Sequence, residues 1–232
     1  MQDVAARQLA ANDAGARWAA GAAAAEPERR SGETGAAIEP EAFDKVRAAV
    51  LGLFARRAFH KVGMRDIARE TGYGMARLYK MAETKDALVT ACLAPDFEAL
   101  AARLAEVSRR EVGTRRRFTA CLGELAAFDI ENPAFARVVR VTTPTCLWDG
   151  EEGPRKLVDQ IADILRAGKR DGSVRTDFEP LALAGHALAM AGGLLSRWAR
   201  EDEGWAPAAP RELAEERSKV LAALIWPAVS AD

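Results

Sequence analysis

Hydrophobic residues recur every three or four positions along most of the chain after residue 40, which is the spacing that places them on one face of an α-helix. The first such stretch covers residues 41–58 and directly follows Pro40, a residue favoured at helix starts. Its apolar stripe consists of Phe43, Val46, Val50, Leu53 and Phe54. We therefore expect an amphipathic first helix over residues 41–58, with this stripe covering a small core.

Two shorter helices joined by a tight turn are predicted for residues 63–85. The apolar residues at helical spacing in the first of them are Met64, Ile67 and Ala68. Gly72 follows and suits a turn, and Leu78 lies where it would fill the angle between two steeply crossing helices. Thr84 is expected to cap the next helix. This order is typical of a helix-turn-helix, whose second helix, here about residues 75–81, enters the major groove of DNA.

The same helical spacing continues from Leu88 to the end of the chain. The expected helices cover residues 88–110, 113–132, 133–141, 156–169, 177–200 and 211–226, with a loop or short broken helix at 142–154. Pro95 lies inside the first of these helices and should kink or break it, because proline has no backbone N–H. The helix at 177–200 is apolar nearly all round, so we expect it to face both its own core and a second subunit. These patterns predict an all-α fold.

The composition agrees with a soluble, mainly helical protein. Of the 232 residues, 49% are hydrophobic and 29% are charged, and Ala, Leu, Arg and Glu are abundant. Residues 1–40 are rich in Ala and Gly and hold few large apolar side chains, so we interpret them as a disordered or weakly helical extension. Two helical domains are expected after this extension, at residues 41–94 and 95–228.

Charge is distributed unevenly along the chain. The whole chain has a net charge of −1, whereas residues 41–94 contain ten Lys or Arg and six Asp or Glu and therefore carry +4. A locally basic segment on a nearly neutral chain is typical of phosphate contact by one domain. A solvated charged surface would have the same composition, so this reading stays open.

Catalytic and metal-binding patterns are missing from the sequence. The three cysteines lack CxxC spacing, and Cys92 and Cys121 fall on apolar helical stretches typical of a core. Because there is no nucleophile elbow, no phosphate-cradling glycine loop and only two histidines, we expect no enzyme activity, catalytic residue, cofactor or metal. No apolar run reaches membrane-spanning length and no secretion signal is visible, which indicates a cytoplasmic protein.

Residues 43–93 resemble the N-terminal domain of the TetR family of bacterial transcriptional regulators. The matching residues are Phe54-Ala55, Phe59, Met64-Arg65-Asp66-Ile67-Ala68, Gly72, Leu78-Tyr79 and Thr84-Lys85-Asp86-Ala87-Leu88. The resemblance implies a three-helix DNA-binding domain with a helix-turn-helix, followed by a helical domain that binds a small effector and dimerises. It also implies a four-helix dimer interface, in which residues 156–169 and 177–200 of each subunit hold the corresponding places.

We call the second helix of the expected helix-turn-helix, at about residues 75–81, the reading helix. Its candidate base contacts are Arg77 and Lys80. The planar fork of Arg77 can reach O6 and N7 of guanine, and Lys80 lies on the same face, near enough for a base or a phosphate. The resemblance assigns Tyr79 to a phosphate, and Arg65 and Lys85 each open a helix whose backbone N–H groups suit a phosphate. The candidate DNA-binding set is completed at the start of the reading helix by Gly74, Met75 and Ala76.

The reading helix departs from the TetR pattern at both ends. Gly74 stands where Ser or Thr is usual, so a hydroxyl that could cap the helix or reach a phosphate is missing. Met81 and Ala82 replace the usual Tyr and Phe, which removes apolar area that anchors the helix. An alternative interpretation is therefore a TetR-like ligand- or protein-binding dimer whose reading head has weakened or lost specific DNA binding.

An effector site is expected between the middle helices. The candidate lining residues are Phe128, Phe135, Val139, Cys146, Trp148, His186 and Met190. Each of them would also suit a helical core, and together they indicate a largely apolar pocket. The expected function is that of a homodimeric repressor which binds double-stranded DNA at a palindromic operator and is released by a small apolar effector.

Overall fold

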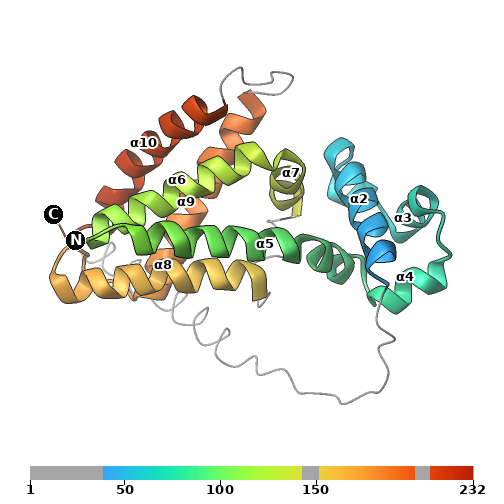
Figure 1. The fold of residues 1–232 in the computed structure, drawn as a ribbon, viewed down its shortest axis with the longest axis horizontal. Helices are drawn as coiled ribbons and strands as arrows, with labels where there is room; N and C mark the ends of the chain where they lie inside the picture. Colours follow the sequence, from blue (N-terminus) through green and yellow to red (C-terminus); the bar gives the residue numbers. More distant parts are fainter. Residues whose placement is uncertain (1–38, 143–151, 202–209, 232) are drawn as a thin grey trace, which may run out of the picture.

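The structure is a computed structural model that describes residues 39–142, 152–201 and 210–231. The helices in this part of the chain are α2 (Pro40–Arg56), the 3-10 helix η1 (Phe59–Lys61), α3 (Met64–Thr71), α4 (Met75–Met81), α5 (Lys85–Arg110), α6 (Thr114–Glu131), α7 (Pro133–Thr142), α8 (Glu152–Asp171), α9 (Pro180–Glu201) and α10 (Pro210–Val229) (Figure 1). Among these residues the only β structure is one antiparallel bridge between Val174 and Ser230. The predicted all-α fold is confirmed.

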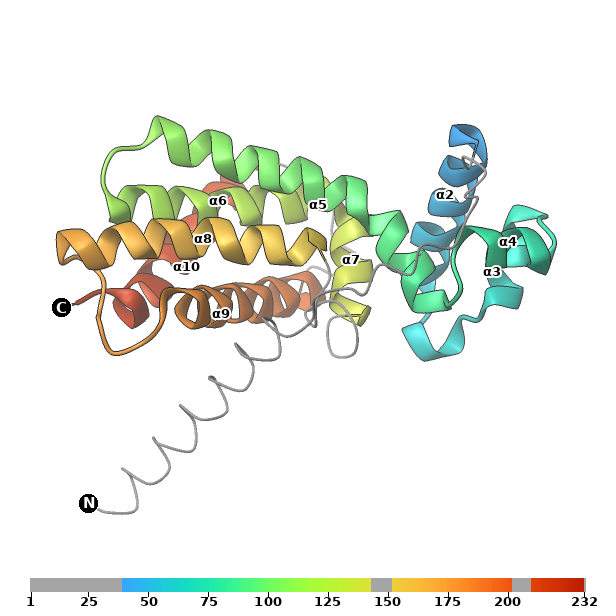
Figure 2. The same cartoon turned by 90° about the horizontal axis from the view of Figure 1, so that it is seen from below.

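The helices form two groups, with α7 between them (Figures 1 and 2). α2, α3, α4 and the first turns of α5 form a small group at one end, which we call the reading head (residues 40–94). The rest of α5 with α6, α8, α9 and α10 forms an elongated bundle. Because α5 is one helix from Lys85 to Arg110, the domain boundary that we expected between residues 94 and 95 falls inside a helix.

The reading head is held together by the apolar stripe predicted for the first helix. Val46, Val50 and Phe54 of α2 have no exposed surface and share a core with the rest of the head. Other members of this core without exposed surface include Ile67, Leu78, Cys92 and Leu93. The Phe54 ring also stacks on Phe59 of η1 with 5.3 Å between centroids. Leu78 therefore fills the angle between α3 and α4, as its position after the turn predicted.

Pro95 lies inside α5 without ending the helix, so the break that we considered does not occur. Arg47 of α2 reaches across this part of α5. Its Nη2 donates to both carboxylate oxygens of Asp96 at 2.7 Å, and its Nε donates to the Cys92 carbonyl oxygen at 3.1 Å. Paired contacts between an arginine and a carboxylate are among the stronger polar contacts in proteins. Arg47 thus fastens α2 to the turn of α5 that contains the proline.

In the bundle, α6 packs against α5 and α10, and α8 packs against α5 and α9. The apolar stripe of α8 is buried inside the chain and consists of Leu157, Ile161, Ile164 and Leu165. Charged residues face outward from α8, for example Arg155, Asp159 and Arg166. The part that residues 156–169 would take in a subunit interface stays a prediction. In the described part of the chain, no helix is both long and apolar enough to cross a membrane.

Candidate DNA-binding helix and effector region

The turn between α3 and α4 is fixed by Thr71 and Gly72. The Thr71 hydroxyl donates to the Ile67 carbonyl oxygen at 2.8 Å and accepts the Tyr73 N–H at 3.2 Å. Gly72 has a φ of 70°, in the left-handed region that favours glycine. This backbone conformation confirms the turn that the sequence predicted at Gly72 and sets the angle between α3 and α4.

The start of α3 is tied to the end of α2 by Asp66. Its carboxylate accepts the Gly63 N–H at 2.9 Å and Nη1 of Arg57 at 3.1 Å. The Gly63 N–H first, and then the Arg57 guanidinium, lower the pKa of Asp66, because both stabilise the ionised form. Asp66 therefore holds the supporting helix of the helix-turn-helix in place while it is ionised.

The helix α4 is anchored by Leu78 and exposes most of its other residues. Leu78 is fully buried, whereas Ala76, Arg77, Tyr79 and Lys80 are exposed. The partly buried residues that pack against the core at the ends of this helix include Met75, Met81 and Ala82. Met81 and Ala82 therefore still anchor the helix, although neither is aromatic. Seen from either direction, α4 lies with α3 at the end of the molecule away from the bundle (Figures 1 and 2).

Gly74 is the residue before α4 and offers no side-chain cap. Its φ of −67° and ψ of 150° are open to any residue, and a Cβ added to it would meet no atom within 4 Å. The absence of a hydroxyl at this position is therefore a feature of the sequence and not a requirement of the fold.

The two candidate DNA contacts that lie outside α4 differ in orientation. Arg65, in the first turn of α3, is exposed. Lys85 is turned inward, because its Nζ donates to the Phe59 carbonyl oxygen at 3.0 Å and lies 3.7 Å from the centroid of the Phe59 ring. Thr84 caps α5 as expected, with its hydroxyl oxygen accepting the Ala87 N–H at 3.0 Å. The Lys85 ammonium thus supports the loop after α2.

Arg77 also has partners within the chain. Its guanidinium carbon lies 4.2 Å from the centroid of the Tyr73 ring, and its Nη2 lies 3.3 Å from Oε2 of Glu39. Lys45 Nζ lies 5.0 Å from the same ring. Sequence reasoning missed Tyr73, Glu39 and Lys45; the one available signal was an aromatic residue directly between the turn glycine and the reading helix.

The effector candidates on α6 and α7 belong to a packed aromatic cluster. Phe135 of α7 makes edge-to-face contacts with Phe128 of α6, at 5.5 Å between centroids, and with Phe97 of α5, at 5.1 Å. All three rings are buried, and Val139 is partly buried against the same core. Phe97 was not among the effector candidates predicted from the sequence.

α7 connects this cluster to the reading head. Arg137 Nε donates to the Phe54 carbonyl oxygen at the end of α2, at 3.3 Å. Arg140 pairs with Asp129 of α6 at 2.9 Å. Burial raises the pKa of Asp129, and the neighbouring Arg140 opposes this increase. α7 is therefore bonded both to α2 and to α6.

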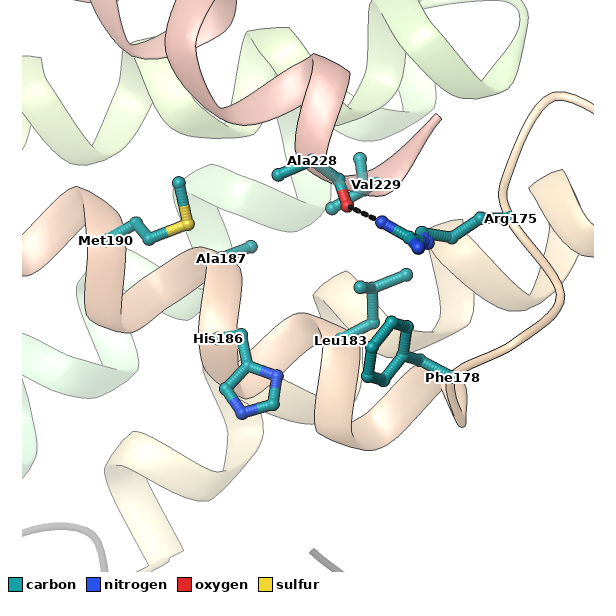
Figure 3. A pocket seen from close by; sticks show the side chains of 8 residues that line it. All are labelled: Arg175, Phe178, Leu183, His186, Ala187, Met190, Ala228 and Val229. Atoms are coloured by element: carbon teal, nitrogen blue, oxygen red, sulfur yellow. Dashed lines mark hydrogen bonds between the residues drawn. The ribbon is translucent and has the colours of Figure 1, made fainter. Parts of the chain in front are cut away.

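His186 and Met190 lie elsewhere, on the exposed side of α9. They line an open pocket of about 150 Å³ together with Arg175, Phe178, Leu183, Ala187, Ala228 and Val229 (Figure 3). Arg175 is held at its edge by Asp177, at 2.6 Å, and by the Ala228 carbonyl oxygen, at 3.3 Å. The predicted effector residues therefore form two separate groups, while Cys146 and Trp148 lie outside the described residues.

Groups suited to metal binding do not come together in the described ranges. No set of three or more His, Cys, Asp or Glu side chains there could hold a metal ion. Cys92 and Cys121 are buried core residues, as predicted, and burial raises the pKa of each thiol to about 12. Burial thus disfavours the reactive thiolate form of both cysteines.

Comparison with known proteins agrees with this geometry. Residues 47–92 match the family model described as bacterial regulatory proteins, tetR family. No curated protein sequence matches the chain.

Several solved structures share the fold. The regulator FadR from Bacillus subtilis, in complex with stearoyl-CoA, is 12% identical with a TM-score of 0.63, over 78% of this chain and 97% of that chain. A TetR family transcription regulator from Marinobacter aquaeolei is 19% identical with a TM-score of 0.59, over 82% and 95%. The ketosteroid regulator KstR2 of Mycobacterium tuberculosis is 16% identical with a TM-score of 0.56, over 84% and 98%. Residues 47–92, which contain the helix-turn-helix, are thus similar to the tetR family of bacterial regulatory proteins, and the chain shares the fold of these solved regulators.

Proposed function

We propose that the chain acts as a homodimeric transcriptional repressor, which binds a palindromic operator and is released from it by a small apolar effector. The observation that carries this proposal is the exposed surface of α4. Arg77, Tyr79 and Lys80 are exposed on a helix that Leu78 anchors in the core, so cationic and hydroxyl groups are presented without loss of the anchor.

The residues of the reading head have different roles in this proposal. Arg77 reads a guanine, Lys80 contacts a base or phosphate, and Tyr79 and Arg65 contact phosphates. The start of the helix has no bulky polar side chain and lets the backbone approach the DNA closely; it consists of Gly74, Met75 and Ala76. Lys85 supports the loop after α2 and does not contact DNA, since its ammonium is bound to Phe59.

The proposed dimer interface lies on α9 and α10. Met190 of α9 and Val220 and Leu224 of α10 are large apolar residues that remain exposed in the single chain. Gly192 and Gly193 are exposed on α9, so a second backbone can approach closely there. A two-fold symmetric pair brings the same surface of each subunit together and gives the two reading heads a fixed separation.

The proposed effector region is the cluster of Phe97, Phe128 and Phe135. A ligand that displaces Phe135 would move α7, and α7 is bonded to α2 through Arg137. The FadR structure with stearoyl-CoA, which has the same fold, supports a ligand that carries an apolar acyl chain. His186 and Met190 are not part of this effector site.

The test is selection of bound duplexes from a random DNA pool by the wild type and by Arg77→Ala. The expected result is enrichment of one palindrome by the wild type and loss of that enrichment in the variant. The matched control is Arg69→Ala, since Arg69 is an exposed arginine of the reading head on α3. A folded dimer that enriches no sequence would contradict the proposal.

A further inference from the structure

The reading head contains a cluster of four side chains, which are those of Tyr73, Arg77, Lys45 and Glu39. Tyr73 lies in the turn between α3 and α4, Arg77 is on α4, Lys45 is on α2, and Glu39 immediately precedes α2. Arg77 and Lys45 place their charges 4.2 and 5.0 Å from the centroid of the Tyr73 ring. Arg77 Nη2 also donates to Oε2 of Glu39 at 3.3 Å. The candidate base reader is thus bound by two groups of its own chain.

The Tyr73 ring that contacts the Arg77 guanidinium is itself held in place by other contacts. The Tyr73 N–H is bound to Thr71 at 3.2 Å, and the ring is partly buried and packs against the core of the head. An arginine side chain that stacks on a fixed ring loses rotamer freedom before DNA arrives. Less entropy is then lost when the fork of Arg77 meets a base, because preorganisation lowers the cost of binding.

Glu39 has the opposite effect on DNA binding. The side chain of Glu39 is 80% exposed and that of Arg77 is 46% exposed, so their ion pair contributes little to stability. It offsets the repulsion between Arg77 and Lys45, two cations over one ring. A guanine offers Arg77 two acceptors in a plane, and the Nη2 hydrogen that points at Glu39 cannot point at the base at the same time.

We propose that Tyr73 orients Arg77 for base reading, and that Glu39 occupies the guanidinium in the free protein and is exchanged for the base when DNA binds. Tyr73 is a positioning residue for specificity, and Glu39 sets the affinity. This inference rests on the DNA binding proposed above, and it adds two residues outside the reading helix to those that determine operator binding.

The test of Tyr73 uses the selected operator and a duplex changed at the base pair where Arg77→Ala loses discrimination. Tyr73→Leu is expected to lose about tenfold in the ratio of the two affinities. Tyr73→Phe keeps the ring and is expected to keep the ratio. In an Arg77→Ala background, Tyr73→Leu should change the ratio no further, because the residue acts through Arg77. Tyr73→Met serves as a second ringless variant, and thermal unfolding of each variant identifies any that fail to fold.

The test of Glu39 compares two exposed carboxylates of the head. Glu39→Gln is expected to tighten binding of the operator by about two- to fivefold, in line with the strength of exposed ion pairs. Glu70→Gln is the control, since Glu70 pairs with Arg56 at 3.4 Å and is also exposed. Equal effects of the two changes would reduce the role of Glu39 to net charge and overturn this part of the inference.

The failures of the two proposals are distinguishable. If Arg77→Ala removes discrimination and the ringless Tyr73 variants retain it, the role of Tyr73 is wrong while the proposed function stands. If the wild type enriches no operator, the proposed function fails, and the inference falls with it.

Discussion

Two glycines of the helix-turn-helix, separated by a single residue, have different conformational requirements. Gly72 has a φ of 70°, whereas Gly74 has a φ of −67°, and a Cβ at either position would meet no atom within 4 Å. Steric space is therefore equal at both positions, and only the backbone conformation separates them. A side chain is strained at Gly72 and unstrained at Gly74.

Gly74→Ser is expected to stabilise the protein by a few tenths of a kcal/mol, because the new hydroxyl can accept an N–H of the first turn of α4. Gly72→Ser is the matched control and is expected to cost about 1 kcal/mol. Chemical unfolding of the three proteins measures both effects. A loss of stability in Gly74→Ser would show that the reading helix begins differently from the geometry described here.

Asp66 gives the reading head a defined response to acid. Since the pKa of Asp66 in the folded protein lies below the ordinary value of an aspartate, its stabilising effect is complete above that ordinary value and is lost as the pH falls through the folded pKa. The stability difference between wild type and Asp66→Asn should therefore be largest at neutral pH and shrink below about pH 4. Unfolding curves of both proteins between pH 7 and 3 measure this difference. A difference that is independent of pH would contradict the ionised contact with Gly63 and Arg57.

At the scale of helices, Pro95 is the clearest local conflict with the fold. Proline in a helix interior removes a backbone hydrogen bond, yet α5 continues through Pro95 and Arg47 binds Cys92 and Asp96 beside it. The proline therefore weakens the one helix that belongs to both the reading head and the bundle.

Pro95→Ala is expected to raise the free energy of unfolding by about 1–3 kcal/mol, because alanine restores the hydrogen bond and has the highest helix propensity. Pro133→Ala is the control, since Pro133 is the first residue of α7, where proline is tolerated. The two variants are compared with the wild type by thermal unfolding. No gain in Pro95→Ala would mean that the surrounding contacts depend on the proline.

Structural features that depend on a few neighbouring residues were predicted correctly from the sequence. The Gly72 turn, the Leu78 anchor and the Thr84 cap each follow from a few neighbouring residues, and all three are present. The inward turn of Lys85 could not be predicted, because it depends on Phe59, which lies 26 positions earlier in the chain.

Long-range packing also determines which of the predicted effector residues are buried and which are exposed. α9 is apolar nearly all round, so its pattern does not reveal which face meets the bundle, and His186 and Met190 are on the exposed face. Phe128 and Phe135 instead face each other within the core. Periodicity identifies apolar residues, but only the packing of α9 against its neighbours separates the two groups.

At the scale of the whole molecule, the reading head and the bundle are connected by α5 and by α7 against α2. The apolar residues that remain exposed on α9 and α10 lie in the bundle and not in the reading head. A dimer formed through the bundle would leave both reading heads free for DNA. The separation of the heads then depends on how α5 and α7 are packed.

Leu224→Glu is expected to weaken dimerisation by about 100-fold or more, because a two-fold interface brings the introduced charge close to its own copy. Val112→Glu is the control, since Val112 is a 78% exposed apolar residue between α5 and α6. Sedimentation of both variants across a concentration series gives the dissociation constants. A Leu224→Glu protein that stays dimeric would remove α10 from the proposed interface.

The most direct test of the central claim is equilibrium binding of the selected palindrome at increasing salt concentrations, by the wild type and by Arg77→Ala, with a scrambled duplex as reference. We predict two protomers per duplex, an affinity for the palindrome about 1,000-fold or more above that for the scrambled duplex, and a steep decrease with salt. Arg77→Ala should lose most of the discrimination and keep most of the salt dependence. Equal affinity of the wild type for the two duplexes would contradict a specific reading head.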